Sequence, residues 1–173
     1  ELKMLKPQNI VEMLGCGSMD AGFAGADWIA ELAGELDAVP VEVLDTGLDP
    51  VRVVAAAPSG LLEGGQLPRR SLVVASEYEN LTRSWICARG LSARFLRSYG
   101  ATEVFPPEDA DCVVDNTASG STLRANGLIV VDELMRSTTC LYASAKAMDN
   151  PQRRERIEWL AMLCKSVLEA RSR

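Results

Sequence analysis

The sequence has 173 residues, is 47% hydrophobic and 24% charged, and carries a formal net charge of −6. A chain of this length can bury one good core or two small lobes. Its acidic balance argues against a general nucleic-acid or anionic-membrane surface, and no apolar stretch is long enough to span a membrane. We therefore expect a cytoplasmic protein with no nucleic-acid partner and no membrane partner.

Histidine is absent from the sequence, and the five cysteines are widely separated. The absence of histidine excludes Ser-His and Cys-His catalytic pairs and histidine-ligated metal sites within this chain. An odd number of cysteines without a C-x-x-C pair favours reduced, mostly buried thiols that have no chemical role. Any catalysis would therefore depend on carboxylates, hydroxyls, arginines and backbone dipoles.

The first half of the chain is predicted to alternate between helices and strands. Pro7 is suited to the first position of a helix, and Gly15 and Gly34 are suited to helix ends. Valine-rich and alanine-rich runs bounded by Gly or Pro indicate strands. In chain order, the expected elements are a helix over 7–14, a strand over 20–25, a helix over 28–32, and strands over 41–44, 51–56 and 72–75.

The second half continues the alternation, which predicts an α/β fold. Asn80 is predicted to cap a helix that ends at Gly90, followed by strands near 94–96 and 112–114 and a helix that begins near Ser121. A long closing helix is expected after Pro151, and its apolar face should pack onto the core. That face consists of Ile157, Leu160, Ala161, Cys164, Val167 and Leu168.

The segment 115–124 carries the strongest chemical signal, because several hydroxyl side chains surround one glycine directly after an apolar strand. Glycine lets consecutive N–H groups converge on an anion, hydroxyls donate further hydrogen bonds, and a following helix directs its positive end to the same point. Asp115 could accept hydrogen bonds from sugar hydroxyls or hold a magnesium ion. The candidate phosphate-binding residues are Thr117, Ser119, Gly120, Ser121 and Thr122.

Composition alone leaves an alternative open, in which residues 117–122 form only a polar turn that caps a helix. The segment is not a Walker sequence, because no Gly-Lys-Ser/Thr follows it. It is not a dinucleotide-binding fingerprint either, because the required glycine spacing is absent.

The segment Asp115–Leu123 resembles the signature loop of the ATP phosphoribosyltransferases, in which an Asp-x-x-x-Thr/Ser-Gly-x-Thr-Leu pattern binds the 5-phosphate and ribose of phosphoribosyl pyrophosphate. Three further stretches resemble the same family in order and spacing. They are Met19–Asp27, Ala75–Arg83 and Gly100–Val104.

The resemblance implies a two-lobed α/β fold of the periplasmic-binding-protein-like type II, with a cleft between the lobes. The first lobe would comprise residues 1–49 and 137–173, and the second lobe, residues 50–136, would carry the phosphoribosyl-binding loop. The implied reaction is the first step of histidine biosynthesis. An adenine ring nitrogen of ATP attacks the anomeric carbon of phosphoribosyl pyrophosphate, and pyrophosphate leaves.

The resemblance also implies roles for individual residues. Asp115 and Glu103 are the catalytic candidates, because they would hold the ribose hydroxyls or magnesium and favour positive charge on the sugar. Both also count among the residues that bind phosphoribosyl pyrophosphate. The nucleotide-binding candidates are Asp20, Gly22, Gly25, Asp27 and Tyr78.

Several of these residues have a plainer interpretation. Glu103 could be a solvated side chain in a turn. Gly22 and Gly25 could serve only the packing of a strand against a helix, and Tyr78 could belong to the core.

The family likeness implies Mg²⁺, ATP, phosphoribosyl pyrophosphate, a homo-oligomer and, for the short form of the family, a separate regulatory subunit. The sequence would lack the family's first strand and its C-terminal regulatory domain, and it could be an inactive fragment or a scaffold. The alternative in another class is a non-enzymatic two-lobed binding protein for a small phosphorylated or carboxylated ligand, because fold alone does not determine function.

Overall fold

The computed structural model describes residues 2–171. Its strands form a six-stranded mixed sheet in the order β1-β6-β2-β5-β3-β4. The chain divides into two compact units, of which the first runs to Pro50 and resumes at Ser137, and the second is Val51–Arg136. The long strands β2 (Val41–Pro58) and β6 (Leu128–Ala143) contribute to both units.

The first unit is built around the end of β6. Strand β1 pairs with β6 in antiparallel fashion, and apolar side chains of the first helix cover the pair. Its buried cluster is Val11, Leu14, Ala24, Cys140 and Tyr142. The elements that belong to this unit alone are α1 (Pro7–Gly15), β1 (Ala21–Gly25), α2 (Ala26–Leu32), α5 (Ala145–Met148) and α6 (Pro151–Arg171).

The second unit has a mixed sheet. Strand β3 is parallel to both β4 and β5, whereas β2 is antiparallel to β5. Its elements are η1 (Ser59–Leu61), β3 (Leu72–Ser76), α3 (Glu79–Ala88), β4 (Ala93–Arg97), η2 (Thr102–Val104), β5 (Cys112–Thr117) and α4 (Ser121–Ala125), with parts of β2 and β6.

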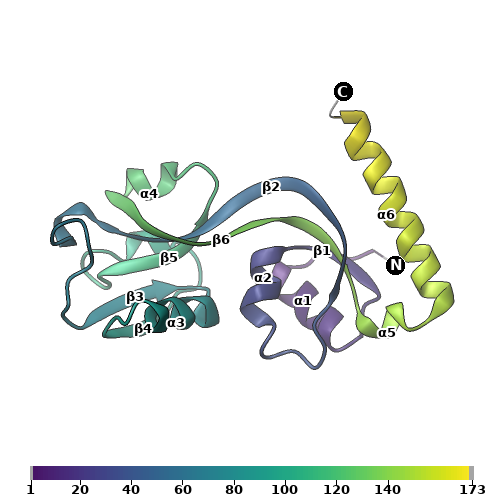
Figure 1. Ribbon diagram of the computed structural model, residues 1–173, viewed down its shortest axis with the longest axis horizontal. Coiled ribbons are helices and arrows are strands. Elements are labelled where there is room, and N and C mark those ends of the chain that lie inside the picture. Colours follow the sequence, from purple (N-terminus) through teal and green to yellow (C-terminus); the bar gives the residue numbers. More distant parts are fainter. Residues whose placement is uncertain (1, 172–173) are drawn as a thin grey trace. The chain divides into compact units, whose positions relative to one another are not determined.

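The central strands of this unit read as continuous apolar runs because both of their faces are covered. Residues 53–57 of β2 are fully buried, as are Val74 and Val113. Helices α3 and α4 lie on opposite sides of these strands (Figure 1), and Leu123 of α4 joins the buried cluster on its side. The core therefore fixes the end of β5, from which the hydroxyl-rich segment emerges.

Most of the predicted elements are present, but several details differ. The strands expected over 41–44 and 51–56 are one strand, β2, because Gly47 and Asp49 accommodate positive φ within an extended chain that continues through Pro50. Asn80 lies inside α3, whose N-cap is Tyr78, so the predicted cap is wrong. Strand β6 was not predicted, although Ile129, Val130 and Val131 near its start are β-branched.

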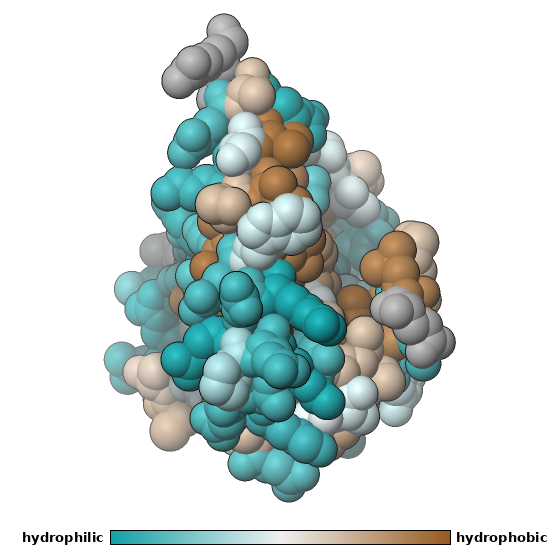
Figure 2. Space-filling view, turned by 90° about the vertical axis from the view of Figure 1, so that its right-hand side faces the viewer, coloured by the Kyte–Doolittle hydropathy of each residue, from teal (hydrophilic) through white to brown (hydrophobic). Residues whose placement is uncertain are grey.

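The closing helix α6 is present, but the prediction that its apolar face packs onto the core is wrong. Only Ile157 of this 21-residue helix is buried, while Leu160 is 40% exposed and Val167 60% exposed. Figure 2 shows brown apolar side chains along this helix, in the upper part of the view. Helix α6 contacts α5 near its start, and a helix of this length extends over about 30 Å, beyond the reach of that contact.

All five cysteines are free, as expected, but they are not mostly buried. Cys112 and Cys140 are buried, Cys164 is intermediate, and Cys16 and Cys87 are exposed. Within residues 2–171, none of the helices is both long enough and apolar enough to cross a membrane.

Candidate functional site

The hydroxyl-rich segment joins β5 to α4 by a tight turn. Strand β5 extends to Thr117, so Asp115 lies within the strand and not at its end as the sequence suggested. Gly120 adopts the left-handed conformation with φ 74°, and its N–H donates to the Thr117 hydroxyl over 2.8 Å. Helix α4 then begins at Ser121, as predicted. The turn is held from inside by Thr117, which is itself buried.

The outer side of the turn presents hydroxyl groups to solvent. The Ser119 hydroxyl donates to the Ser121 hydroxyl over 2.9 Å, and the Ser121 N–H donates to Ser119 over 3.3 Å. Thr122 is also exposed. Arg124 of α4 donates from Nη1 to the Ser119 carbonyl over 3.0 Å and thereby links the helix to the turn. The segment therefore combines a rigid backbone with three accessible hydroxyls, which suits an anionic ligand.

Asp115 lies in an unfavourable place for a negative charge. The pKa of its carboxyl is raised to about 6, chiefly by burial and also by the nearby carboxylates of Glu103 and Glu77. The N–H of Asn116 donates to Asp115 over 2.7 Å and acts in the opposite direction. A cation or a set of sugar hydroxyls placed here would relieve this crowding of carboxylates.

Glu77 lies within Ala75–Arg83, one of the stretches that resemble the family, but no role was predicted for it. It directly follows β3, whose last residue, Ser76, pairs with Val114 of the parallel strand β5. Glu77 and Asp115 therefore lie next to this pair on neighbouring chain segments, Glu77 just beyond β3 and Asp115 within β5. An acidic residue close behind each of two apolar runs was the available signal.

Glu103 is half-buried on η2, so it is not simply a solvated side chain. The turn before it is anchored by a buried 2.7 Å hydrogen bond between the hydroxyls of Ser98 and Thr102. Ala101 adopts a positive φ of 47° to form this turn. The structure thus brings Glu103 near Asp115, where its charge affects the Asp115 pKa.

Tyr78 belongs to the core, as the plainer interpretation held, and it also supports the segment. Its side chain is 1% exposed, and its hydroxyl accepts a 2.8 Å hydrogen bond from the Asn116 amide. The Ser76 hydroxyl accepts from the Tyr78 N–H over 2.9 Å and donates to the Val114 carbonyl over 2.6 Å. Through its hydrogen bond with Asn116, Tyr78 therefore also helps to fix β5, the strand that carries Asp115.

Replacing Tyr78 by phenylalanine is expected to lower the free energy of unfolding by about 1 kcal/mol, because the Asn116 amide loses its part-buried hydrogen bond to the Tyr78 hydroxyl. Urea unfolding of the two proteins measures this difference. Tyr99→Phe is the matched control, since that side chain is 92% exposed and should leave stability unchanged. Equal stability of Tyr78→Phe and the parent would show that the hydrogen bond contributes nothing.

The other nucleotide-binding candidates lie in the first unit. Asp20 is exposed and forms an ion pair of 2.7 Å with Arg153. Asp27 is buried, accepts a 2.7 Å hydrogen bond from the Ser137 hydroxyl, and donates its N–H to the same hydroxyl over 3.0 Å. A Cβ at Gly25 would lie 2.1 Å from an Asp27 carboxylate oxygen, so this glycine allows the Asp27 conformation.

Gly22 allows close packing of α1 on β1. A Cβ at this position would lie 2.7 Å from Cγ2 of Ile10. Gly22→Ala is therefore expected to lower the free energy of unfolding by about 1–3 kcal/mol, as overpacked positions do. In an Ile10→Ala background the same change should cost much less, because the clashing methyl group is gone.

Urea unfolding of the single and double variants measures this coupling. Gly34→Ala is the control, because a Cβ there meets no atom within 4 Å. A Gly22→Ala variant as stable as the parent would instead favour a role for Gly22 outside packing.

An α/β fold in which a glycine- and hydroxyl-rich turn joins a buried strand to a helix is typical of proteins that bind a phosphate group. A family model for ATP phosphoribosyltransferase matches residues 6–165. The chain belongs to this ATP phosphoribosyltransferase family, as the resemblance of the motifs predicted.

Curated relatives agree with this assignment. The ATP phosphoribosyltransferase of Chlorobaculum parvum is 36% identical over 178 residues, and that of Koribacter versatilis is 34% identical over 174 residues. Both matches cover 100% of this chain but only 59% and 60% of the relatives. The chain therefore spans about three fifths of the length of these curated proteins.

A solved structure supports the fold. The ATP phosphoribosyl transferase (HisG:HisZ) complex from Thermotoga maritima contains a chain that matches with a TM-score of 0.85 at 24% identity. The match covers 96% of this chain and 79% of that chain. The predicted fold class, α/β of the type II periplasmic-binding-protein-like kind, is confirmed.

Proposed function

We propose that the protein to which this chain belongs transfers the phosphoribosyl group of phosphoribosyl pyrophosphate to an adenine ring nitrogen of ATP, with release of pyrophosphate. The observation that carries this proposal is the turn after β5, in which Thr117 holds the left-handed Gly120 and leaves Ser119, Ser121 and Thr122 exposed. The resemblance of this turn to the signature loop of the family supports the 5-phosphate of the sugar as its ligand. The alternative of a non-enzymatic binding protein is not favoured, because the curated relatives are named as transferases.

In this proposal the chain acts mainly by alignment and electrostatics. The turn holds the 5-phosphate, while Asp115 and Glu103 accept hydrogen bonds from the ribose hydroxyls. As the bond from the anomeric carbon to pyrophosphate breaks, positive charge develops on the sugar, and the nearby carboxylates stabilise it. The adenine nitrogen forms the new bond with its own electron pair. Fixing two reactants in one geometry supplies a large share of such a rate enhancement.

The residues at Asp115 fit a magnesium ion that the protein and its substrate hold together. Among the residues that the structure describes, no group of three side chains could hold a metal by itself. Mg²⁺ commonly takes one or two carboxylates and completes its shell with substrate phosphates and water. Asp115 and Glu103 could supply the carboxylates, and the ion would neutralise charge on the departing pyrophosphate.

The nucleotide-binding candidates keep different roles in the proposal. Asp20 is exposed and could accept hydrogen bonds from ATP if it exchanged its partner Arg153. Gly22, Gly25 and Asp27 would act by shaping the backbone of β1 and α2, since Asp27 pairs with Ser137 and a Cβ at either glycine would meet a neighbouring side chain. Tyr78 would act through Asn116.

The assembly in the proposal is a cytoplasmic homo-oligomer. The name of the Thermotoga maritima structure includes a second component, HisZ, and this supports a regulatory subunit for the present protein as well. Light scattering of the chain alone and of the chain mixed with candidate subunits would test both parts.

Calorimetric titration of phosphoribosyl pyrophosphate with magnesium into this chain tests the proposal, with Asp115→Ala as the comparison. We expect binding by the parent that the variant loses. Addition of ATP to the full-length protein should then release pyrophosphate. A folded full-length protein that neither binds phosphoribosyl pyrophosphate nor releases pyrophosphate would contradict the proposal.

A further inference from the structure

Arg52 lies beside the phosphate-binding turn because of the pairing between β2 and β5. In this antiparallel pair Arg52 is directly opposite Thr117. Directly opposed residues direct their side chains to the same face of a sheet, with Cβ atoms about 5 Å apart. Thr117 is the residue whose hydroxyl holds Gly120, so the Arg52 side chain starts next to the inner end of the turn.

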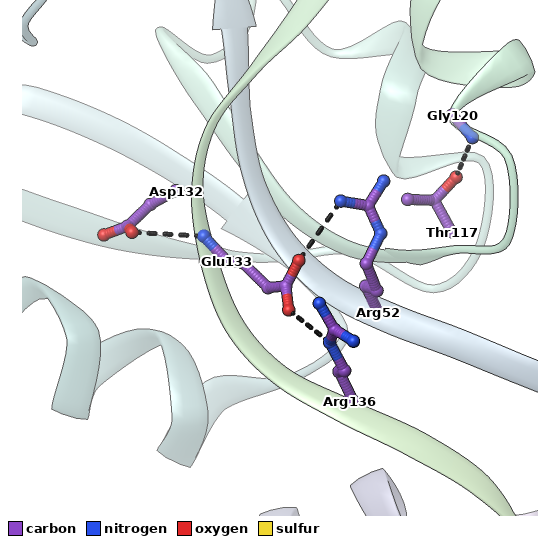
Figure 3. Close-up of polar contacts among 6 residues, drawn as sticks. All are labelled: Arg52, Thr117, Gly120, Asp132, Glu133 and Arg136. Carbon is purple, nitrogen blue, oxygen red and sulfur yellow. Dashed lines mark hydrogen bonds and ion pairs between the residues drawn. The ribbon is translucent and has the colours of Figure 1, made fainter.

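The guanidinium of Arg52 is held from one end only. Its Nη1 forms an ion pair of 3.1 Å with Glu133 of β6, and Glu133 also binds Arg136 over 2.8 Å. Figure 3 shows Arg52 between Glu133 on one side and Thr117 with Gly120 on the other. Two arginines share one carboxylate, so Glu133 is not the partner of Arg52 alone.

The geometry leaves donors of Arg52 for another partner. Arginine carries five N–H donors in a flat fork, and the ion pair with Glu133 uses Nη1. The Arg52 side chain is 36% exposed, whereas that of Arg136 is 81% exposed. Arg124, the other arginine at the turn, already donates to the Ser119 carbonyl.

We propose that Arg52 of β2 contributes to phosphate binding at the turn. Its Nε and Nη2 are available to the same anion that the Ser119, Ser121 and Thr122 hydroxyls bind. This inference rests on the proposed function, and it adds a cation from β2 to a site otherwise formed by neutral donors. The plainer alternative is a half-exposed ion pair that only joins β2 to β6. Such pairs contribute little, so the two interpretations differ in ligand binding more than in stability.

Calorimetric titration of ribose 5-phosphate separates the two interpretations, because this ligand carries the sugar phosphate without the pyrophosphate. Arg52→Gln should raise its Kd by about 10- to 100-fold, as expected for a charge-assisted contact. Arg52→Lys keeps the charge but loses the fork, and should raise the Kd by about 3- to 10-fold. Arg136→Gln is the matched control, since it also removes an ion pair to Glu133, and should change the Kd less than 2-fold.

The parent's binding of phosphoribosyl pyrophosphate distinguishes the possible failures. If the parent binds it and both Arg52 variants bind ribose 5-phosphate as the parent does, the role of Arg52 is wrong while the proposed function stands. If neither the parent nor the full-length protein binds phosphoribosyl pyrophosphate, the proposed function fails and this inference fails with it. Thermal melts of every variant show whether it is folded, and Arg52→Lys keeps the test valid should Arg52→Gln unfold.

Discussion

Replacing Asp115 by asparagine is expected to lower kcat/KM for phosphoribosyl transfer by about 100-fold or more, and at the same time to stabilise the protein at neutral pH. The activity falls because a neutral amide cannot favour positive charge on the sugar or bind magnesium strongly. The stability rises because the folded protein no longer holds a buried negative charge near Glu103 and Glu77. The amide oxygen can still accept the hydrogen bond from the Asn116 N–H.

The pH dependence of stability follows from the direction in which folding shifts the Asp115 pKa. Folding raises the Asp115 pKa from its ordinary value of 3.8 to about 6, so the folded state binds more protons than the unfolded state between these values. The contribution of Asp115 to stability is therefore fully present below pH 3.8 and is lost as the pH rises to about 6. The stabilisation by Asp115→Asn should appear above pH 6, by roughly 2 kcal/mol, and vanish near pH 4.

Urea unfolding at pH 4.5, 6 and 7.5 measures this stabilisation, and a pyrophosphate-release assay of the full-length protein measures activity. Asp109→Asn is the control, because Asp109 is exposed and should change neither quantity. Parent activity should also rise between pH 5 and 7 as Asp115 ionises. An Asp115→Asn variant that is less stable than the parent at pH 7.5 would show that the carboxylate is not crowded there.

The candidate turn could be predicted because its signal is local. Gly120 and the surrounding hydroxyls are adjacent in sequence, and the turn that they form is confirmed from Thr117 to the start of α4 at Ser121. The two additional charged residues at this site depend on strand register. Glu77 meets Asp115 through the parallel pairing of β3 with β5, and Arg52 meets Thr117 through the antiparallel pairing of β2 with β5. A single sequence does not contain these registers.

The fold class was predictable from the alternation of elements, but the long strands were not. Gly47 and Pro50 are typical of a break between strands, and β2 continues through both. The extended conformation is maintained there by pairing with neighbouring strands, which outweighs the local preference. For the closing helix, the helix itself was predicted correctly but its packing was not. The spacing of apolar residues indicates a helix with an apolar face, but it does not show whether another surface is close enough to cover that face.

Gly120→Ala is expected to raise the Kd for phosphoribosyl pyrophosphate by at least about 30-fold. An alanine at φ 74° is strained by about 1–2 kcal/mol, and its Cβ would lie 2.9 Å from Nη1 of Arg124. Arg124 would have to leave the Ser119 carbonyl, so the N–H and hydroxyl groups of the turn would lose their common direction. Calorimetric titration measures the loss of binding, and urea unfolding measures the cost in stability.

Gly127→Ala separates strain from loss of the site. Gly127 lies just beyond the other end of α4 with φ 71°, nearly the same as Gly120, and a Cβ there meets no atom within 4 Å. Both variants should therefore lose a similar 1–2 kcal/mol of stability, while only Gly120→Ala should lose ligand binding. If both variants bound phosphoribosyl pyrophosphate as the parent does, the turn would merely cap a helix, and the phosphate would have to bind elsewhere. Because backbone strain is matched in the pair, a difference in binding can only come from the position of Gly120 within the turn.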